Sequence, residues 1–543
     1  MQGVGGWLAL YILVMIIQTA TNYISAYGAC KAELYIGRDL KRETFNHLQT
    51  LSFSYFNQNS VGYTHARVMS DTDRIASTLA WGLMEAVWYI AYLLLAIVMM
   101  FVLNWKLALC VMVIVPVLVI SGAYFQKKLV FFHRRVREQN SKITGAFNEG
   151  ITGAKTTKTL VIEDKVEQEF DDLTGEMKRL SVRAMHFRGV FMSTTAFAAS
   201  IALAIVLWRG GVITRDGVIL IGTLSVFMNY AQGMMEPVQW LVQVMSSLVN
   251  VQVNVERVTR LLETESDVSD TPEVTAKYGD AFYPKKENWE PLYGDIEFQD
   301  VTFRYPDGSE NVLEHFNLKV PQGTNVAIVG ETGAGKSTLV NLVCRFFEPT
   351  QGRILIDGRD ARERSQLWLH SNIGYVLQTP HLFSGTVLEN LRYGRPDATM
   401  DEIEAAVKTV SADQIIARLP DGYNTDIGEG GNTLSTGEKQ LLSFARALLA
   451  DPRIFVLDEA TSSVDTVTER LIQDAIEKVM AGRTSFIIAH RLSTIRHADV
   501  ILVVHDGKII ESGTHRSLMN AKGAYYQLYT HQYREEQTRS MMD

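Results

Sequence analysis

The segment Gly330–Thr338, GETGAGKST, has the residue types and the spacing that bind phosphate. It follows the apolar run NVAIVG and precedes TLVNLVCRFF, so it fits G-x-x-x-x-G-K-[ST] in a strand–loop–helix context. Successive backbone N–H groups of such a loop point at a β-phosphate, beside the positive end of the helix. We expect Lys336 to reach the β- and γ-phosphates and Ser337 to bind Mg²⁺. The alternative is a glycine-rich turn with a chance Lys-Ser pair.

Two adjacent carboxylates end a second apolar run, IFVLDEA, at Ile454–Ala460. The pattern is typical of a buried strand that delivers acids to its carboxyl end. We expect Asp458 to hold Mg²⁺, and Glu459 to orient the water that attacks the γ-phosphate or to accept its proton. A purely structural pair is the weaker interpretation, because adjacent carboxylates near phosphate are costly without a cation.

Two further polar residues and a second loop have less specific patterns. His490 in IIAHRLS and Gln378 in GYVLQTP each follow an apolar run, and a lone histidine after a strand is more often structural. In LSTGEKQ, Leu434–Gln440, glycine and hydroxyl side chains again suit contact with phosphate. Ser435 followed by Glu438 also fits a capping box, and a capped helix N-terminus is itself an anion site, so both roles stay open.

These motifs lie in the second half of a chain of 543 residues, which is too long for one compact core. Apolar residues concentrate before about Tyr230 and charged residues after about Asn254. Runs without charge, each long enough for a bilayer core of ~30 Å, predict five membrane spans. The runs are 1–30, 86–105, 107–125, 190–208 and 218–235, the last continuing past Glu236-Pro237.

The connections between these runs carry very different numbers of basic residues. Segment 31–85 has six and segment 126–189 has thirteen, whereas the alternate connections offer only Lys106, Arg209 and Arg215. The positive-inside rule therefore places the two long segments, and everything after the last span, in the cytoplasm. Helical periodicity in both long segments predicts that the membrane helices continue into the cytoplasm. An odd number of spans leaves the N-terminus outside.

Hydrophobic periodicity stops over 264–294, which predicts a polar linker, and short strand-like runs alternating with helical stretches follow it. The net charge of −8 gives no basic surface of the kind that binds nucleic acid, so no such partner is predicted. The three cysteines have no paired spacing and predict neither a disulfide framework nor a zinc site.

The order of the motifs resembles the ATP-binding cassette superfamily, in particular exporters that fuse a membrane domain ahead of the ATPase. The resemblance covers essentially the whole chain. It implies an α-helical transmembrane bundle of the type IV exporter class over 1–263, the linker 264–294, and an α/β P-loop ATPase domain over 295–543. The supporting motifs in chain order are Tyr305, Gly330–Thr338, Gln378, TDIGEGG from Thr425, LSTGEKQ, Asp458-Glu459, SSVD at Ser462–Asp465 and His490.

The resemblance also assigns roles, with ATP and Mg²⁺ as cofactors. Glu459 is the catalytic base, His490 the switch histidine, and Tyr305 stacks on adenine. Metal contacts fall to Ser337, Gln378 and Asp458. The remaining nucleotide contacts are assigned to Gly330, Glu331, Thr332, Gly333, Ala334, Gly335, Lys336, Ser337, Thr338 and Gln378, and to Ser435, Thr436, Gly437, Glu438 and Asp465.

In this family two cassettes pair head to tail, so Ser435 and Gly437 would contact the γ-phosphate held by a partner subunit. The loop tips around Asn57–Tyr63 and Leu160–Phe170 would act as coupling helices that rest near Gln378. We therefore expect half of an exporter, multi-pass in the plasma membrane with a cytoplasmic cassette, that moves a hydrophobic or amphipathic substrate outward by alternating access. Alternatives of the same architecture are a lipid flippase, a peptide exporter and a nucleotide-regulated subunit that does not pump.

The sequence departs from the family pattern in two places. The commonest signature reads LSGGQ, whereas Thr436 and Glu438 stand here, which favours a heterodimer although a homodimer is possible. Family members normally have six spans, and the first run here resembles the second, so we expect a missing leading helix. Glu236 is a functional candidate because intramembrane carboxylates are costly. A structural role for it is the more common outcome. Aromatic and methionine side chains could line a hydrophobic cavity, although a lipid-facing or packing role is more common for them; they are Trp88, Tyr89, Met99, Met228 and Met234.

Overall fold

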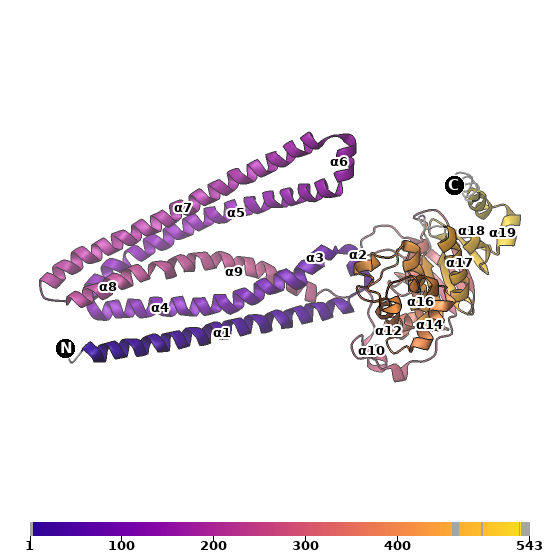
Figure 1. Ribbon diagram of the computed structural model, residues 1–543, viewed down its shortest axis with the longest axis horizontal. Helices are drawn as coiled ribbons and strands as arrows, with labels where there is room; N and C mark the ends of the chain where they lie inside the picture. Colours follow the sequence, from indigo (N-terminus) through magenta and orange to yellow (C-terminus); the bar gives the residue numbers. More distant parts are fainter. Residues whose placement is uncertain (1–3, 459–465, 490–491, 532, 534–543) are drawn as a thin grey trace. The chain divides into compact units, whose positions relative to one another are not determined.

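The computed structural model describes residues 4–458, 466–489, 492–531 and 533, which form two compact units (Figure 1). Unit 1 comprises Met1–His47 and Gly62–Glu263, and unit 2 comprises Leu48–Val61 and Thr264–Asp543. The division differs from a simple two-part chain, because a short segment from the N-terminal half belongs to the C-terminal unit.

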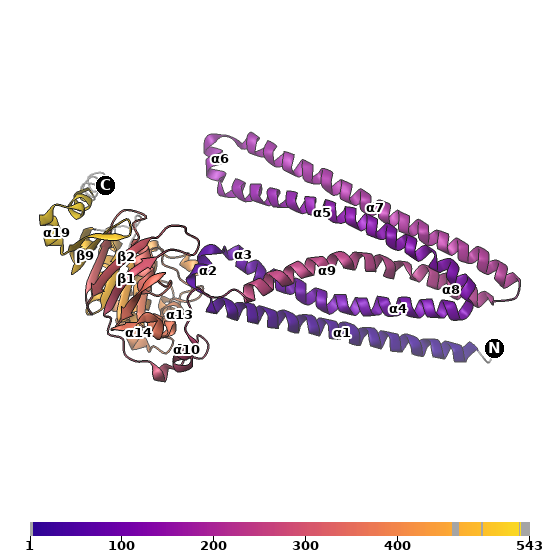
Figure 2. The ribbon, with the colours of Figure 1, turned by 180° about the vertical axis from the view of Figure 1, so that it is seen from behind.

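Unit 1 is built from long helices, and α5 runs alongside α7 and α4 alongside α9 (Figures 1 and 2). The 53 residues of α7 extend ~80 Å at 1.5 Å per residue, more than twice the thickness of a bilayer core. The predicted continuation of the membrane helices beyond the bilayer is therefore confirmed. The helices are α1 Val4–Thr50, α3 Val61–His65, a π-helical turn Ala66–Asp71, α4 Thr72–Met112, α5 Ile114–Thr152, α6 Ala154–Leu160, α7 Glu163–Arg215, α8 Ile221–Gly233 and α9 Met235–Leu262.

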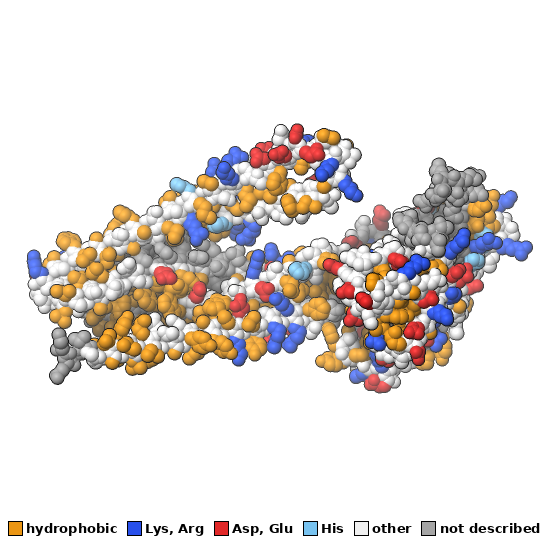
Figure 3. All heavy atoms as spheres, in the orientation of Figure 1, with side chains coloured by type: hydrophobic (Ala, Val, Ile, Leu, Met, Phe, Trp, Pro, Cys, Tyr) orange, Lys and Arg blue, Asp and Glu red, His pale blue; other side chains and the backbone are white. Residues whose placement is uncertain are grey.

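Three described helical segments are long and apolar enough to cross a membrane: Gly5–Thr50, Val61–Met112 and Glu163–Arg215. They contain most of run 1–30 and all of runs 86–105 and 190–208. Large apolar side chains cover the surface of these helices (Figure 3), as lipid contact requires. Runs 107–125 and 218–235 lie across the α4–α5 and α8–α9 boundaries, and their membrane crossing stays a prediction.

The break between runs 86–105 and 107–125 is a kink rather than a loop. Asn104 leaves the helical conformation, with φ −163° and ψ 104°, and its side-chain oxygen accepts a hydrogen bond from the Leu107 N–H at 3.1 Å. The asparagine thus caps the helix that restarts after it. A buried cluster that includes Met100, Phe227 and Met234 packs α4 against α8, and Met228 packs against it, which confirms the packing role expected of Met228 and Met234.

Unit 2 is an α/β domain with two sheets, as predicted. A four-stranded antiparallel sheet has the order β2-β1-β4-β5, and a six-stranded sheet has the order β10-β9-β3-β8-β7-β6, parallel except for β10. The strands are β1 Ile296–Phe303, β2 Leu313–Val320, β3 Asn325–Val329, β4 Gln351–Ile356, β5 Arg359–Asp360, β6 Ile373–Val376, β7 Ile454–Asp458, β8 Thr484–Ile488, β9 Val500–His505 and β10 Lys508–Gly513. The helices are α2 Phe53–Gln58, α10 Pro272–Tyr278, α11 Lys336–Val343, α12 Gln366–Ser371, α13 Val387–Arg392, α14 Met400–Thr409, α15 Asp413–Ile416, α16 Thr436–Leu449, α17 Thr466–Met480, α18 Leu492–Arg496 and α19 His515–Ala521.

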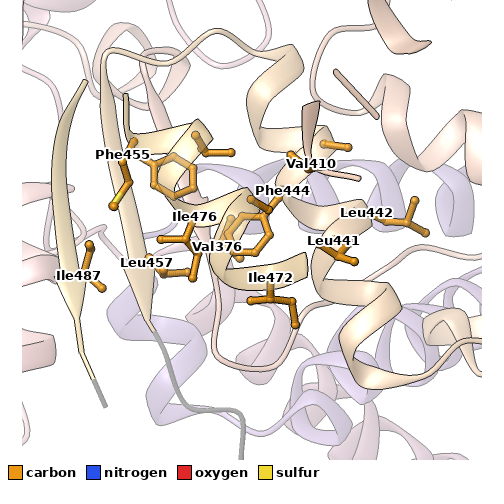
Figure 4. Close-up of a cluster of buried hydrophobic side chains, with 14 of the residues drawn as sticks. Val376, Val410, Leu441, Leu442, Phe444, Phe455, Leu457, Ile472, Ile476 and Ile487 are labelled. Carbon is orange, nitrogen blue, oxygen red and sulfur yellow. The ribbon is translucent and has the colours of Figure 1, made fainter. Parts of the chain in front are cut away.

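Each face of the six-stranded sheet supports a separate hydrophobic core. Along β3, Val326 and Ile328 enter one core with α11, while Ala327 and Val329 enter the other with α14, α16 and α17. Figure 4 shows the second core, where Phe444 of α16 lies with Ile472 and Ile476 of α17 beside the strands. Because strand side chains alternate between faces, α11 and α16 are held on opposite sides of the sheet.

The segment 264–294, predicted as a polar linker, packs into unit 2. Helix α10 begins at a Thr271 cap, and its Val274 and Tyr278 are buried in the core that contains α11. Leu292 joins them. The pattern was hard to recognise in the sequence because the apolar residues that pack are widely spaced among polar ones.

Two short helices stand near the predicted loop tips but at different residues. Helix α2 ends at Gln58 rather than reaching Tyr63, and in unit 2 the Phe53 ring stacks on Phe346 with centroids 5.0 Å apart. Helix α6 ends at Leu160, where the second tip was predicted to begin. The expected positions of the two loop tips came from the resemblance to the family. In unit 2 the aromatic side chain of Phe53 packs α2 against Phe346.

Arg345 links the 264–294 segment to the cassette, and its replacement should destabilise unit 2. The buried guanidinium pairs with Asp270 and Glu348, each at 2.9 Å, and donates to the Arg364 carbonyl. In Arg345→Ala two half-buried carboxylates lose their buried cation, which costs up to about 3–5 kcal/mol. We expect the apparent melting temperature of the cassette in the full-length protein to fall by roughly 10 °C.

The matched control is Arg359→Ala, which removes an exposed arginine 3.6 Å from Glu290. Exposed pairs contribute about 1 kcal/mol or less, so this variant should melt close to the wild type. Equal losses in the two variants would contradict an anchoring role for Arg345.

Candidate functional site

The predicted phosphate loop joins a buried strand to a helix, as its motif requires. β3 ends at Val329, the loop follows, and α11 starts at Lys336. Gly330 has φ +151°, and a Cβ at this position would lie 2.2 Å from the Val504 carbonyl oxygen. Only glycine fits there, because any side chain would collide with the backbone of β9. The strand–loop–helix context of the motif is therefore present, and its contact with phosphate stays a prediction.

Lys336 is a buried cation at the start of α11. Its ammonium donates to the carbonyls of Gly330 and Glu331, both at 2.7 Å. Burial lowers the pKa of Lys336, and the negative charge of Asp458 acts in the opposite direction. The lysine is thus held inside the loop and within electrostatic reach of the carboxylate predicted to bind metal. Ser337, next to it, is exposed.

Tyr305 lies beside the first turn of α11. Its hydroxyl is 2.9 Å from Thr338 Oγ1, and its ring makes edge contacts with Phe303 and Phe347 at centroid distances of 4.9 and 5.1 Å. These contacts fix the half-buried ring next to the phosphate loop. The position suits the predicted adenine contact, which stays a prediction.

The other predicted groups converge because parallel strands end at one edge of the sheet. Asp458 ends β7, and the exposed Gln378 follows neighbouring β6 by two residues. β8 lies between β7 and β3 and is parallel to both, so the phosphate loop begins at the same edge, where β3 ends. Three predicted residues, Glu459, Asp465 and His490, lie outside the described residues. The strands that precede Glu459 and His490 both end at this edge.

Ser435 caps α16 in a capping box. The Ser435 N–H donates to Glu438 Oε2 at 2.8 Å, and the Glu438 N–H donates to Ser435 Oγ at 3.4 Å. The local role foreseen from the sequence is confirmed, and the Glu438 carboxylate is turned back onto its own helix. Ser435 and Thr436 remain exposed while Gly437 is buried. The Ser435 hydroxyl also donates to Glu438 Oε2 at 2.9 Å, and the exposed helix N-terminus can still face an anion.

The structure does not unite the signature with the phosphate loop in one core. Residues of α16 pack in the core of one sheet face, and residues of α11 pack in the core of the other. The loop Gly330–Thr338 lies at the sheet edge where Asp458 ends β7. The signature starts α16, which covers the sheet face opposite to α11. This arrangement is compatible with a signature that serves a second cassette.

The Mg²⁺ expected with ATP does not require a cluster of three or more protein carboxylate, histidine or cysteine ligands. The described residues contain no group of three or more His, Cys, Asp or Glu side chains that could hold a metal ion. Mg²⁺ in phosphate chemistry commonly uses one or two carboxylates, waters and the phosphates themselves. Asp458, Ser337 and Gln378 at one edge fit that donor set.

Sequence reasoning missed the contact surface of α2. Phe346, which follows α11, stacks on Phe53 and lies 5.6 Å from the ring of Tyr375, the residue before the end of β6. Tyr375 of this aromatic cluster precedes Gln378 by three residues in the chain. The resemblance had placed the coupling helices near Gln378. The signal available in the sequence was the pair of phenylalanines at 346 and 347 directly after the phosphate-loop helix.

Comparison with known proteins bears on both units. Residues 2–238 match the model of the ABC transporter transmembrane region, and residues 313–462 match that of the ABC transporter. The chain is 34% identical over 521 residues to the putative multidrug export ATP-binding/permease protein YgaD of Bacillus subtilis, covering 96% of this chain and 88% of the relative. It is 36% identical over 498 residues to the ATP-dependent lipid A-core flippase of Desulfotalea psychrophila, covering 91% and 84%.

A solved structure of a bacterial Atm1-family ABC exporter with ATP bound has a TM-score of 0.78 and 27% identity, covering 95% of this chain and 88% of that one. The order of the two parts, a membrane-spanning helical region followed by an ATP-binding cassette, is thus shared with these proteins over nearly their full length. Multi-pass location in the plasma membrane with a cytoplasmic cassette, and ATPase-coupled transport, follow from the same matches. The chain belongs to the ABC transporters, as an exporter-type subunit that fuses a transmembrane region to an ATP-binding cassette.

Proposed function

We propose that this chain is one half of an ATP-driven exporter that moves a hydrophobic or amphipathic substrate out of the cytoplasm or the inner leaflet by alternating access. The observation that carries the proposal is the separation of two phosphate-contacting loops within one cassette. The loop with Lys336 lies at the sheet edge, and the helix capped by Ser435 covers the other face. Two cassettes that each supply one loop complete a nucleotide site, so ATP binding closes them and hydrolysis releases them.

Within that site the chain's residues divide the work. Lys336 turns from its loop carbonyls to the β- and γ-phosphates, and Tyr305 holds the adenine. Ser337, Asp458 and Gln378 hold Mg²⁺, which neutralises phosphate charge when it is bound. Glu459 activates the attacking water, and His490 and Asp465 support the γ-phosphate side of the site. The names of the relatives, a multidrug export protein and a lipid flippase, support ATP-driven transport as the overall function.

The partner we favour is a different half-transporter. Glu438 places a carboxylate in the signature that the partner's ATP would meet, whereas the site with Glu459 keeps its acidic pair. Such asymmetry fits a heterodimer with one altered site, and a homodimer is the alternative. A lipid flippase is the second candidate function, favoured by the similarity to a lipid A-core flippase.

Glu438→Gln tests the cost of that carboxylate. Glutamine also forms a capping box with Ser435, so α16 keeps its cap while a negative charge near the partner's γ-phosphate is removed. We expect the Michaelis constant for ATP to fall about threefold in the complete transporter, a modest electrostatic effect at a half-buried position. Lys439→Gln, one residue along, is the matched charge control, and an unchanged constant in Glu438→Gln would contradict the assignment.

Transport itself is tested with the complete transporter in proteoliposomes. We expect a fluorescent amphipathic substrate to move only when Mg²⁺ and ATP are present on the cassette side, and not with Glu459→Gln. ATP hydrolysis without any movement across a panel of amphipathic drugs, lipids and peptides would favour a subunit that does not pump.

A further inference from the structure

Two carboxylates in the membrane part of unit 1 accept hydrogen bonds from neutral donors among the described residues. Glu85 accepts a hydrogen bond from the Trp240 indole at 2.7 Å, and Glu236 accepts one from the Tyr89 hydroxyl at 3.1 Å. The chain has no lysine or arginine between 75 and 105 or between 216 and 256, the stretches of α4, α8 and α9 that surround them. A carboxylate in such a segment is costly without a cation. Protein groups nearby in the sequence do not supply one.

Helices α4 and α9 place several aromatic rings around these two carboxylates. Tyr89 and Trp240 lie 4.9 Å apart between centroids, Trp88 meets Tyr89 edge-on at 5.0 Å, and Trp88 stacks on Tyr92 at 5.8 Å and 14°. The Tyr92 hydroxyl also packs over Gly233, where a Cβ would lie 2.1 Å from it. We call this group the acidic-aromatic cage, made of Glu85, Trp88, Tyr89, Tyr92, Glu236 and Trp240.

The cage combines the two features that recognise an organic cation. Electron-rich ring faces attract a cation by their quadrupole, and aromatic cages bind quaternary ammonium groups this way. The two carboxylates add negative charge, and the flanking stretches 75–105 and 216–256 contain no lysine or arginine. Glu85 and Glu236 are exposed, and the Trp88 side chain is 55% exposed, so an occupant can reach both rings and charges.

We propose that the acidic-aromatic cage is a binding site for lipophilic organic cations. The inference rests on the proposed export function, for which it names the substrate class: an amphipathic molecule with a delocalised or quaternary positive charge. An anion of equal size is rejected by the two carboxylates. A neutral hydrophobe gains ring contacts but no charge pairing.

A nearby pair provides an internal comparison. Glu33 of α1 accepts a hydrogen bond from the Trp81 indole of α4 at 2.8 Å, the same kind of contact that joins Glu85 to Trp240. No ring stacking joins Trp81 to another described aromatic residue. Glu33 thus ties two helices together without a cage, and its removal reports what a purely structural glutamate does.

The test uses the full-length protein in lipid nanodiscs, with tetraphenylphosphonium and tetraphenylborate as probes of equal shape and opposite charge. Equilibrium binding is measured on the wild type, Glu33→Gln, and Glu85→Gln/Glu236→Gln. We expect saturable tetraphenylphosphonium binding that weakens about tenfold or more in the double variant and is unchanged in Glu33→Gln. Tetraphenylborate should bind far more weakly to the wild type and should not weaken further in the double variant.

Equal affinity of the wild type for both probes, or equal loss in the double variant and Glu33→Gln, would overturn the proposal. If the double variant fails to fold, as judged by gel filtration and ATP binding, the phosphonium–borate preference of the wild type alone decides. Failure of the cage is distinguishable from failure of the export function. A protein that transports neutral or anionic amphiphiles but does not bind tetraphenylphosphonium refutes only the cage.

Discussion

We expect Glu459→Gln to lower ATP turnover by about a hundredfold or more, with ATP still binding and closing the two proposed cassettes. The reason is that glutamine keeps the shape of the side chain but cannot accept the proton of the attacking water. Asp458, one residue earlier at the end of buried β7, is left in place to hold the metal. Turnover is measured as phosphate release at saturating ATP, and closure as ATP-dependent retention of labelled nucleotide.

The control for this variant is Glu477→Gln, which removes an exposed glutamate of α17 that pairs with His497 at 3.2 Å. Its turnover should match that of the wild type. Near-normal hydrolysis in Glu459→Gln would refute Glu459 as the base and leave the activation of water to another group.

Replacing Lys336 by alanine is expected to abolish tight ATP binding, with an increase in the dissociation constant of about tenfold to a hundredfold. The ammonium is buried within the loop and bonded to the Gly330 and Glu331 carbonyls, so it is already positioned for phosphate. Hydrogen bonds to charged groups contribute about 1.5–3 kcal/mol each, which sets this range. The measurement is equilibrium binding of a fluorescent ATP analogue to the full-length protein.

Lys319→Ala is the matched control, since Lys319 is an exposed lysine of β2 that pairs with Glu297 at 3.2 Å. Its affinity for nucleotide should be unchanged. If Lys336→Ala binds ATP as tightly as Lys319→Ala does, the loop Gly330–Thr338 is not the phosphate site.

The cassette motifs could be predicted from sequence because each depends on local chemistry. The segment Gly330–Thr338 must join a strand to a helix, Ser435 needs Glu438 three residues later, and Asp458 must end an apolar strand. All three requirements are visible in short stretches of sequence, and the structure meets each one. The roles of the groups toward ATP depend on a second cassette and stay predictions.

Other features depended on contacts between residues far apart in the chain, and sequence reasoning placed them less well. The 264–294 segment looked like a linker because its anchor, Asp270, meets Arg345 only in the folded domain. The first loop tip was predicted at Asn57–Tyr63, a few residues after the start of α2 at Phe53. The contact that holds α2 joins Phe53 to Phe346, nearly three hundred residues away in the chain. The cage escaped notice as a unit because Glu85 and Trp240 are 155 residues apart.

The central claim is that one ATP is held between two cassettes, each offering part of its binding site. The most direct measurement compares ATP hydrolysis in nanodiscs that hold a single copy of this chain with hydrolysis in nanodiscs that hold the complete two-cassette transporter. We predict that the single-copy discs hydrolyse ATP at least about tenfold more slowly per chain, because the signature at Ser435 has no partner's phosphate to contact. Equal rates per chain in the two kinds of disc would contradict the account.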